Sequence, residues 1–230
     1  MDFIVKITTK LNFFDLIAPH TCRGCGHIGE AFCDRCKKNL KTSHQNYCPN
    51  CKTNNTNGKC KKCKNLPPIF NVGDRNSIVG ALIKDYKYNS VRALSKPLAE
   101  LLDNALPIIN QPVTIIPLPT IDSHIRQRGL DHTYLLAKQL SKRHHNWSVK
   151  KAIIRANNSI QVGSDKKTRL TQANLAYSIN PKFKPEKNIT YLLLDDVWTT
   201  GASIRAGIKI LKENDINDIV VGILAVSRLD

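Results

Sequence analysis

From residue 68 to the C-terminus, apolar residues recur in two alternating patterns. In one pattern they stand three or four positions apart, which places them on one face of an α-helix. In the other they form short unbroken runs, which are typical of buried strands. The helical pattern predicts helices over 76–88, 91–106, 129–143 and 202–214. The apolar runs predict strands over 113–119, 149–156, 191–197 and 218–226.

This alternation predicts an α/β fold, with a mostly parallel sheet that carries helices on both faces. Ligands of such sheets bind beyond the carboxyl ends of the strands. The stretch YLLLDDVWTTGAS, residues 191–203, lies at such a position. Its apolar run ends in two acids, and we expect the next helix to begin near Ala202.

The same stretch combines two kinds of ligand-binding group. Asp195 and Asp196 suit sugar hydroxyls or a metal ion. The free backbone N–H groups of a helix start suit a phosphate, and the hydroxyls of Thr199, Thr200 and Ser203 add to this cradle. A sugar phosphate carries both kinds of partner, so this is the ligand class that the stretch predicts. The competing interpretation is a strand end followed by an ordinary helix cap.

All eight cysteines lie before residue 64, in four Cys-x-x-Cys pairs. Each such pair can supply half of a tetrahedral zinc site. The four pairs therefore predict two structural zinc ions. The short gaps favour zinc sites shared by neighbouring pairs, and a cross-braced arrangement of the first pair with the third stays open. The predicted ligands are Cys22, Cys25, Cys33 and Cys36 for one ion, and Cys48, Cys51, Cys60 and Cys63 for the other.

Three other uses of these cysteines compete with two zinc sites. Disulfides are typical of secreted chains, and the N-terminus shows no secretory signal pattern. A redox-active pair is expected once, beside a β-α-β pattern, and not four times in a lysine-rich segment. One zinc ion with four spare thiols is the third alternative.

The chain is strongly basic, with a formal net charge of +17 over 230 residues. The first 70 residues hold 12 basic and 4 acidic side chains, so the cysteine-rich part is the more densely charged. A positive field of this size attracts nucleic acids or phosphorylated metabolites, although a solvated basic surface is equally compatible with composition alone. The aromatic residues Phe32 and Tyr47 could stack on bases, but small-core positions are the favoured interpretation.

These patterns predict three parts: an N-terminal helix over 1–19, a double zinc-ribbon module over 20–66 and an α/β domain over 67–230. Pro67 and Pro68 mark the join, because two prolines stop a helix and stiffen the chain. No apolar stretch is long enough for a transmembrane helix, so no membrane insertion is expected. With no signal pattern at the N-terminus, the predicted location is cytoplasmic.

LLLDDVWTTGAS resembles the binding signature of the type I phosphoribosyltransferases, which hold phosphoribosyl pyrophosphate (PRPP). The resemblance implies that the two aspartates bind the ribose 2′- and 3′-hydroxyls, that the following loop binds the 5′-phosphate, and that Mg²⁺ bridges pyrophosphate and sugar. The implied PRPP-binding residues are Asp195, Asp196, Val197, Thr199, Thr200, Gly201, Ala202 and Ser203.

Further motifs narrow the resemblance to one family. The four cysteine pairs, ALIKDYKY, IIPLP followed by RQRGLDHTYLLAKQL, and RLTQANLAYSI together resemble the ComF family, which is associated with natural competence and DNA uptake. The resemblance implies single-stranded DNA and DNA-uptake proteins as partners, a pyrophosphate loop at PLPT and a closing loop over NNSIQVGSDKKTRL. The implied pyrophosphate and loop candidates are Leu118, Pro119, Arg126, Arg128, Lys166, Lys167 and Arg169.

The chain also departs from the family pattern. Asp131 and His132 stand where Asn and Gln are usual, and Gln172 where Asn is usual. Purine-type transferases carry an acid, a candidate general base, where this chain has Thr199, which cannot act as a base near neutral pH. Three functions therefore remain open: a PRPP- and DNA-binding protein, an active transferase for an unidentified base or amine, and a structural partner in DNA uptake.

Overall fold

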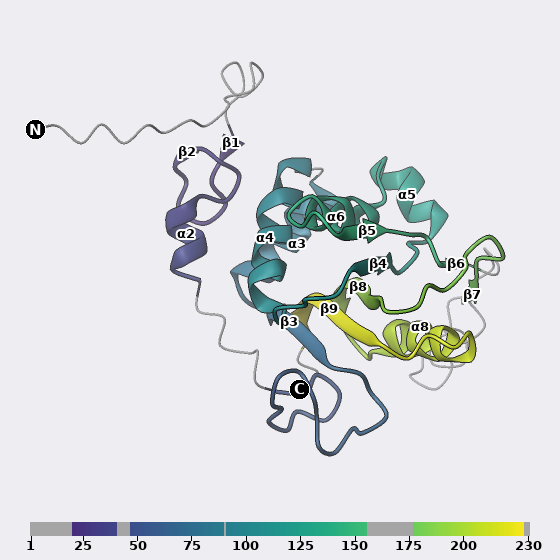
Figure 1. The fold of residues 1–230 in the computed structure, drawn as a ribbon. Coiled ribbons are helices and arrows are strands. Elements are labelled where there is room, and N and C mark those ends of the chain that lie inside the picture. Colours follow the sequence, from purple (N-terminus) through teal and green to yellow (C-terminus); the bar gives the residue numbers. More distant parts are fainter. Residues whose placement is uncertain (1–19, 41–46, 90, 156–176, 228–230) are drawn as a thin grey trace, which may run out of the picture. The chain divides into compact units, whose positions relative to one another are not determined.

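A computed structural model describes residues 20–40, 47–89, 91–155 and 177–227 (Figure 1). The predicted N-terminal helix over 1–19 and the whole of the predicted closing loop lie outside these ranges. The chain divides into two compact units, Met1–Leu40 and Lys41–Asp230. The first unit holds the short strands β1 (His20–Thr21) and β2 (Ile28–Gly29), which pair antiparallel, and helix α2 (Asp34–Lys38).

The second unit is built on a five-stranded sheet in which all neighbouring strands run parallel. This arrangement confirms the predicted α/β class. Adjacent apolar positions are buried in both central strands, as expected for a parallel sheet that is covered on both faces. In spatial order the strands are β3 (Ile69–Asp74), β9 (Ile219–Val226), β8 (Thr190–Trp198), β4 (Val113–Pro117) and β5 (Trp147–Val149).

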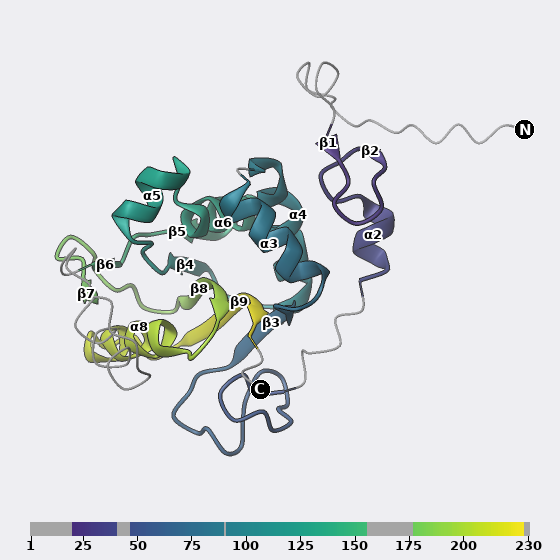
Figure 2. The ribbon, with the colours of Figure 1, turned by 180° about the vertical axis from the view of Figure 1, so that it is seen from behind.

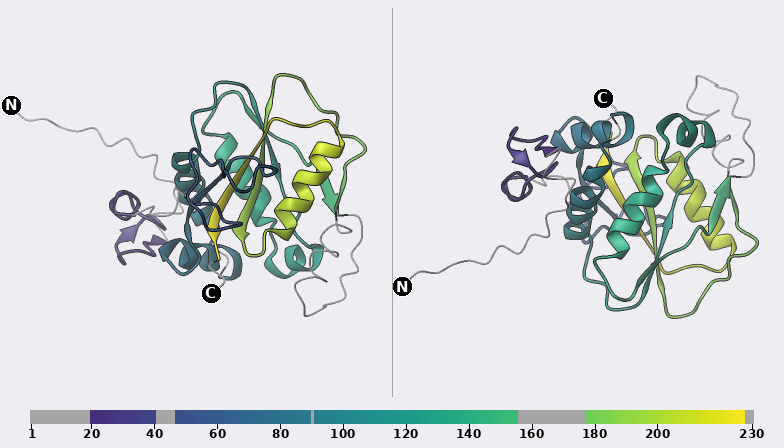
Figure 3. Two further views of the ribbon diagram at one scale, coloured as in Figure 1. Left: turned by 90° about the horizontal axis from the view of Figure 1, so that it is seen from below. Right: turned by 90° about the horizontal axis from the view of Figure 1, so that it is seen from above.

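Helices cover the two faces unequally. One face carries α3 (Ile78–Tyr88), α4 (Ser95–Ala105) and α6 (His132–Ser141), and the other carries α8 (Ala202–Glu213) (Figures 1 and 3). Helix α8 buries one stripe of apolar residues against the sheet. Figure 2 shows the same layers from behind, with the short helix α5 (Asp122–Arg128) following β4. No helix among the described residues has the length and apolar content that crossing a membrane requires.

The observed elements differ from the predicted ones at several places. The sequence pattern missed β3, because its six residues follow a proline pair and mix polar with apolar side chains. The predicted helix 91–106 divides into a 3₁₀ turn, η1 (Arg92–Leu94), and α4. The predicted strand 149–156 also divides, because the chain leaves the sheet after β5 and forms β6 (Ile153–Arg155), which pairs antiparallel with β7 (Tyr177–Ile179).

The second cysteine segment belongs to the same compact unit as the sheet. Tyr47 and Leu66 pack against the main hydrophobic cluster. The backbone N–H of Ile69 donates to the carbonyl of Gly58 at 3.0 Å. Phe32, in the first unit, is almost fully buried and takes the core position favoured from the sequence. Tyr47 is only partly buried where it packs against the cluster.

Candidate functional site

The predicted sugar-phosphate residues lie at the carboxyl edge of the sheet, where β4 ends beside β8 and β8 continues to Trp198. Pro117 of β4 lies opposite Leu194 of β8. The backbone N–H of Leu118 donates to the carbonyl of Leu194 at 2.9 Å. The predicted pyrophosphate loop therefore begins directly beside the acidic pair, although the two segments are far apart in sequence.

The two acids form a coupled pair within the end of β8. The backbone N–H of Asp196 donates to a carboxylate oxygen of Asp195 at 2.8 Å. Burial, and next the charge of Asp196, raise the pKa of Asp195 to about 7, while the charge of Lys87 opposes this rise. Lys87, at the end of α3, forms an ion pair with Asp196. At neutral pH the pair thus carries less than its full negative charge.

The loop after β8 is short and closely packed. Gly201 takes a left-handed backbone, with φ of 72°, directly before α8 begins at Ala202. A Cβ at this position would lie 2.2 Å from the ring of Trp198. Glycine is therefore required for two reasons, the left-handed backbone angle and the close packing of Trp198. The hydroxyl of Thr200 accepts the N–H of Ala202 at 3.3 Å. The N-terminus of α8 thus lies beside the hydroxyl of Thr200.

Sequence reasoning missed three side chains near this cradle, namely Lys87, Arg155 and Tyr177. Burial raises the pKa of Tyr177, while side-chain hydrogen bonding with Ser203 and Arg155 opposes the rise. The Arg155 guanidinium lies 5.2 Å from the Tyr177 ring centre, and its Nε and Nη1 atoms are buried without a hydrogen-bond partner. Arg155 is the last residue of β6 and shows no motif of its own, so only the fold reveals its place.

Several cations converge at the same edge. The guanidinium of Arg128 lies 4.7 Å from the ring centre of Tyr88, and its Nε is buried without a partner. The pKa of His124 is lowered first by burial and then by the charges of Arg128, Arg155 and Lys87. A local positive field of this kind favours a polyanion such as pyrophosphate.

The remaining loop candidates divide into two groups. Arg126 is exposed on α5, and Pro119 is half-buried at the end of β4. The predicted loop cations Lys166, Lys167 and Arg169 lie outside the described residues. The departures Asp131 and His132 take structural places at the start of α6: Asp131 accepts the N–H of Tyr134 at 3.1 Å, and the His132 ring packs edge-on against Tyr86.

The eight cysteines gather into two clusters of four, each with its four sulfur atoms within 4.8 Å of one another. A tetrahedral zinc site with Zn–S bonds of about 2.3 Å places its sulfurs about 3.8 Å apart. The observed Sγ–Sγ distances are 3.8 Å for Cys22 and Cys36, 3.7 Å for Cys25 and Cys33, and 3.4 Å for Cys51 and Cys60. Neighbouring pairs in sequence share a cluster, and both clusters could hold zinc.

The surroundings of these thiols also suit a metal. The backbone N–H groups of Gly24 and Cys33 donate to the sulfur of Cys22 at 3.4 and 3.3 Å. Burial opposes ionisation of Cys22, but backbone hydrogen bonds lower its pKa to about 6. Burial and the neighbouring thiols raise the pKa of Cys36 to about 12. Four thiolates this close repel one another, so full ionisation needs a bound cation.

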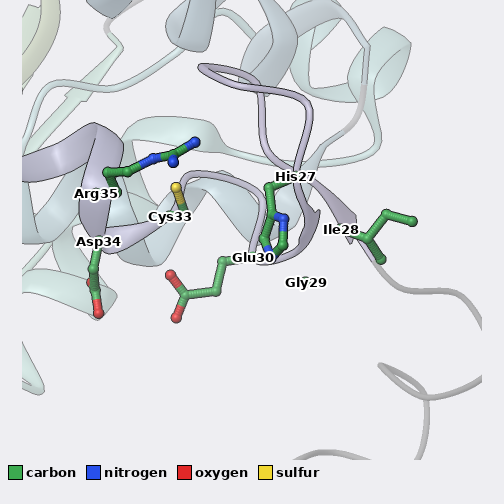
Figure 4. A pocket seen from close by; sticks show the side chains of 7 residues that line it. All are labelled: His27, Ile28, Gly29, Glu30, Cys33, Asp34 and Arg35. Atoms are coloured by element: carbon green, nitrogen blue, oxygen red, sulfur yellow. The ribbon is translucent and has the colours of Figure 1, made fainter.

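A shallow hollow lies beside the first cluster (Figure 4). Its wall brings together the acids Glu30 and Asp34, the basic groups His27 and Arg35, and the metal-ligand candidate Cys33. This mixture of charges has no single ligand preference, and the hollow holds none of the residues predicted for PRPP.

Exposed lysines surround the second cluster. They are Lys59, Lys61, Lys62 and Lys64. Their positive charge lies within a segment of the chain that contains Cys60 and Cys63, so any zinc ion bound there would hold these lysines on a rigid loop.

Comparison with known proteins identifies two relatives. No family model matches the chain. The chain is 27% identical over 231 residues to Competence protein F of Haemophilus influenzae, an alignment that covers 94% of this chain and 99% of that protein. It is 22% identical over 199 residues to Competence protein ComFC of Bacillus subtilis, covering 80% of this chain and 79% of that protein.

Proposed function

We propose that this chain, which belongs to the ComF family, serves a competence-associated function in which it binds PRPP or a related ribose phosphate with Mg²⁺. The proposal rests on one observation. Two coupled acids lie close to the N-terminus of a helix, at one edge of a parallel sheet. Asp195 and Asp196 suit the ribose hydroxyls, and the turn from Thr199 to Ser203 suits the 5′-phosphate.

The cations at this edge support a pyrophosphate group as part of the ligand. Arg128 and Arg155 each carry buried guanidinium nitrogens without a partner, and unpaired buried donors of this kind are costly unless a ligand accepts from them. Mg²⁺ binds carboxylate and phosphate oxygens, so the acids and the ligand itself would hold it. The residues present fit this ion, whose role would be to neutralise the charge of the bound phosphates.

A titration of PRPP with Mg²⁺ by calorimetry tests this proposal. The double variant Asp195→Asn/Asp196→Asn keeps the shapes of the two side chains and removes their charge, and we expect its affinity for PRPP to fall at least about a hundredfold. The charge-matched control Glu213→Gln/Asp215→Asn removes two acids at the far end of α8 and should bind like the wild type. Equal affinity in both double variants would show that the acidic pair is not the sugar site.

Single-stranded DNA is the second ligand that we propose for this protein. The exposed lysines around the second cysteine cluster support it, because single strands bind through phosphate contacts to positive grooves and loops. Both relatives are named competence proteins, and a competence-associated role supports DNA as a candidate ligand.

Transfer of the phosphoribosyl group to a base or amine is a further candidate activity. The convergent charges of Lys87, Arg128 and Arg155 favour it, because they could stabilise a pyrophosphate leaving group. Incubation with PRPP, Mg²⁺ and a panel of nucleobases and amines tests it through pyrophosphate release. Release that depends on one acceptor supports transfer, while PRPP binding without release across the panel supports a binding or structural role.

A further inference from the structure

The second cysteine cluster is joined to the candidate phosphate loop through one asparagine. Asn50 lies between Cys48 and Cys51, and its side-chain Nδ2 donates to the sulfur of Cys63 at 3.2 Å. The Oδ1 atom of the same side chain accepts from Nη1 of Arg205 at 2.8 Å. Both hydrogen-bonding ends of this amide are therefore used, one toward the cluster and one toward α8.

Arg205 continues the connection to the loop. Its Nη2 atom donates to the backbone carbonyl of Thr200, and its guanidinium lies 5.6 Å from the ring centre of Trp198. Thr200 in turn accepts the N–H of Ala202 at the start of α8. A guanidinium is planar and rigid, so its two hydrogen bonds couple the position of Asn50 to that of the Thr200 carbonyl.

We propose that Asn50 and Arg205 form a positioning link through which a metal ion in the second cluster holds the phosphate loop in its binding conformation. Affinity for a ribose phosphate would then depend on the second cluster and not on the first. This inference rests on the proposed function, because it concerns the same loop. Arg205 acts here through Thr200 and is a positioning residue.

The chemistry of the cluster explains why the metal matters. A closed four-thiolate site leaves no open position for a reaction, so its contribution is structural. Residues 47–66 contain two isolated β-bridges and no regular helix or strand, and a bound metal supplies the folding free energy that such a segment otherwise lacks. When the metal leaves, the sulfur of Cys63 loses its fixed position, and Asn50 loses the acceptor that orients it.

Other contacts hold the segment on the sheet unit without Arg205. Lys212 Nζ donates to the carbonyl of Asn65 at 3.2 Å, and Tyr47 and Leu66 pack on the hydrophobic cluster. Replacement of Arg205 should therefore cut the link while the segment stays in place. This separation allows the positioning role to be measured apart from folding.

The test compares two cysteine double variants of the full chain. Cys51→Ser/Cys63→Ser disables the second cluster, and Cys25→Ser/Cys36→Ser disables the first as a matched control. Each should contain one zinc ion fewer than the wild type by elemental analysis. We expect the second-cluster variant to bind PRPP about tenfold more weakly, with faster amide hydrogen exchange in residues 199–203. The first-cluster variant should keep wild-type affinity within about twofold.

Two further variants separate the link from the metal itself. Arg205→Met and Asn50→Ala keep all eight thiols, so they should retain the wild-type zinc content and still show the weaker binding and faster exchange. Arg205→Lys should rescue at most part of the effect, because one ammonium cannot hold both acceptors. If the second-cluster variant fails to fold, these two variants alone decide the question.

The inference is overturned if Arg205→Met exchanges its loop amides like the wild type, or if both cysteine variants lose affinity equally. Hydrogen exchange needs no ligand. If the wild type does not bind PRPP, the proposed function fails, while the exchange comparison still tests whether the second cluster positions the loop.

Discussion

Lys87 of α3 forms an ion pair with Asp196 of β8, inside the site where a ribose would bind. Both side chains are about 15% exposed, so water screens their attraction only partly. The neighbouring Asp195 has its pKa raised to about 7, and the charge of Lys87 limits that rise. Lys87 therefore favours the ionised form of Asp195, against burial and the charge of Asp196.

Removal of this lysine should shift the pH dependence of ligand binding. In Lys87→Met the pKa of Asp195 rises further, because the charge that opposed protonation is lost. The acids must be ionised to bind Mg²⁺, so we expect the pH at which PRPP–Mg²⁺ affinity is half lost to move upward by about one unit. Calorimetric titrations across pH 6–9 measure it. The exposed Lys84→Met, one helical turn away, is the control, and the same shift there would refute a specific role for Lys87.

Asp195 should make the folded protein less stable as pH rises from about 4 to 7. Its pKa is raised from 3.8 in the unfolded chain to about 7 in the folded one, so the folded state binds more protons in this window. Asp195→Asn removes this cost. We expect the variant to stabilise the ligand-free protein by about 2 kcal/mol at pH 8 and by little at pH 4. The figure at pH 8 is already reduced to allow for the partial solvent exposure of Asp195.

Denaturant unfolding of wild type and variant at the two pH values measures this difference. Asp196→Asn is the informative comparison: it removes a charge that raises the pKa of Asp195 but also breaks the ion pair with Lys87, so it should stabilise less than Asp195→Asn. A stability difference for Asp195→Asn that is independent of pH would contradict the assignment of this titration to Asp195.

Gly201→Ala should be more damaging than Gly129→Ala. Both glycines have a left-handed backbone, with φ of 72° and 66°. An added Cβ at Gly201 would meet the Trp198 ring at 2.2 Å, whereas at Gly129 the nearest atom is 3.8 Å away. We expect a loss of about 1 kcal/mol from backbone strain at Gly129 and about 3 kcal/mol at Gly201, where the clash adds to it.

Thermal or denaturant unfolding of the two variants measures the difference in stability. Trp198 fluorescence gives a second measurement, because its environment should change only in Gly201→Ala. If the two variants lose equal stability, the close packing of Trp198 against the loop does not determine the choice of glycine.

The lysines of the second cysteine segment should determine the salt dependence of DNA binding. Each phosphate contact contributes about −0.7 to the slope of log K against log salt for single strands. Replacing Lys59, Lys61, Lys62 and Lys64 by Gln should therefore make the slope shallower by about 3. Filter binding of labelled single strands across a salt series measures it. An unchanged slope would place the DNA contacts elsewhere on the chain.

Some features could be predicted from the sequence because they depend on local spacing. The two zinc-site cysteine sets follow from pairs three residues apart, and the structure groups them as neighbouring pairs. The acids at the end of a strand and the helix start at Ala202 follow from an apolar run and from turn chemistry. The sequence did not predict β3 or the division of 149–156 between two sheets. Short strands that mix polar and apolar residues form only when they pair with strands that are distant in sequence.

The sequence by itself determined the α/β class, the four Cys-x-x-Cys pairs and the motif at 191–203, because periodicity and spacing are local properties of a chain. Which pairs share a cluster was decided by the tertiary structure. Only the tertiary structure decided that Lys87 pairs with Asp196 and that Arg155 lies over the Tyr177 ring, since no sequence pattern connects these residues. It also decided that Arg205 meets Asn50, a contact between residues that are distant in sequence. Such contacts arise from packing of remote elements, which local preferences do not encode.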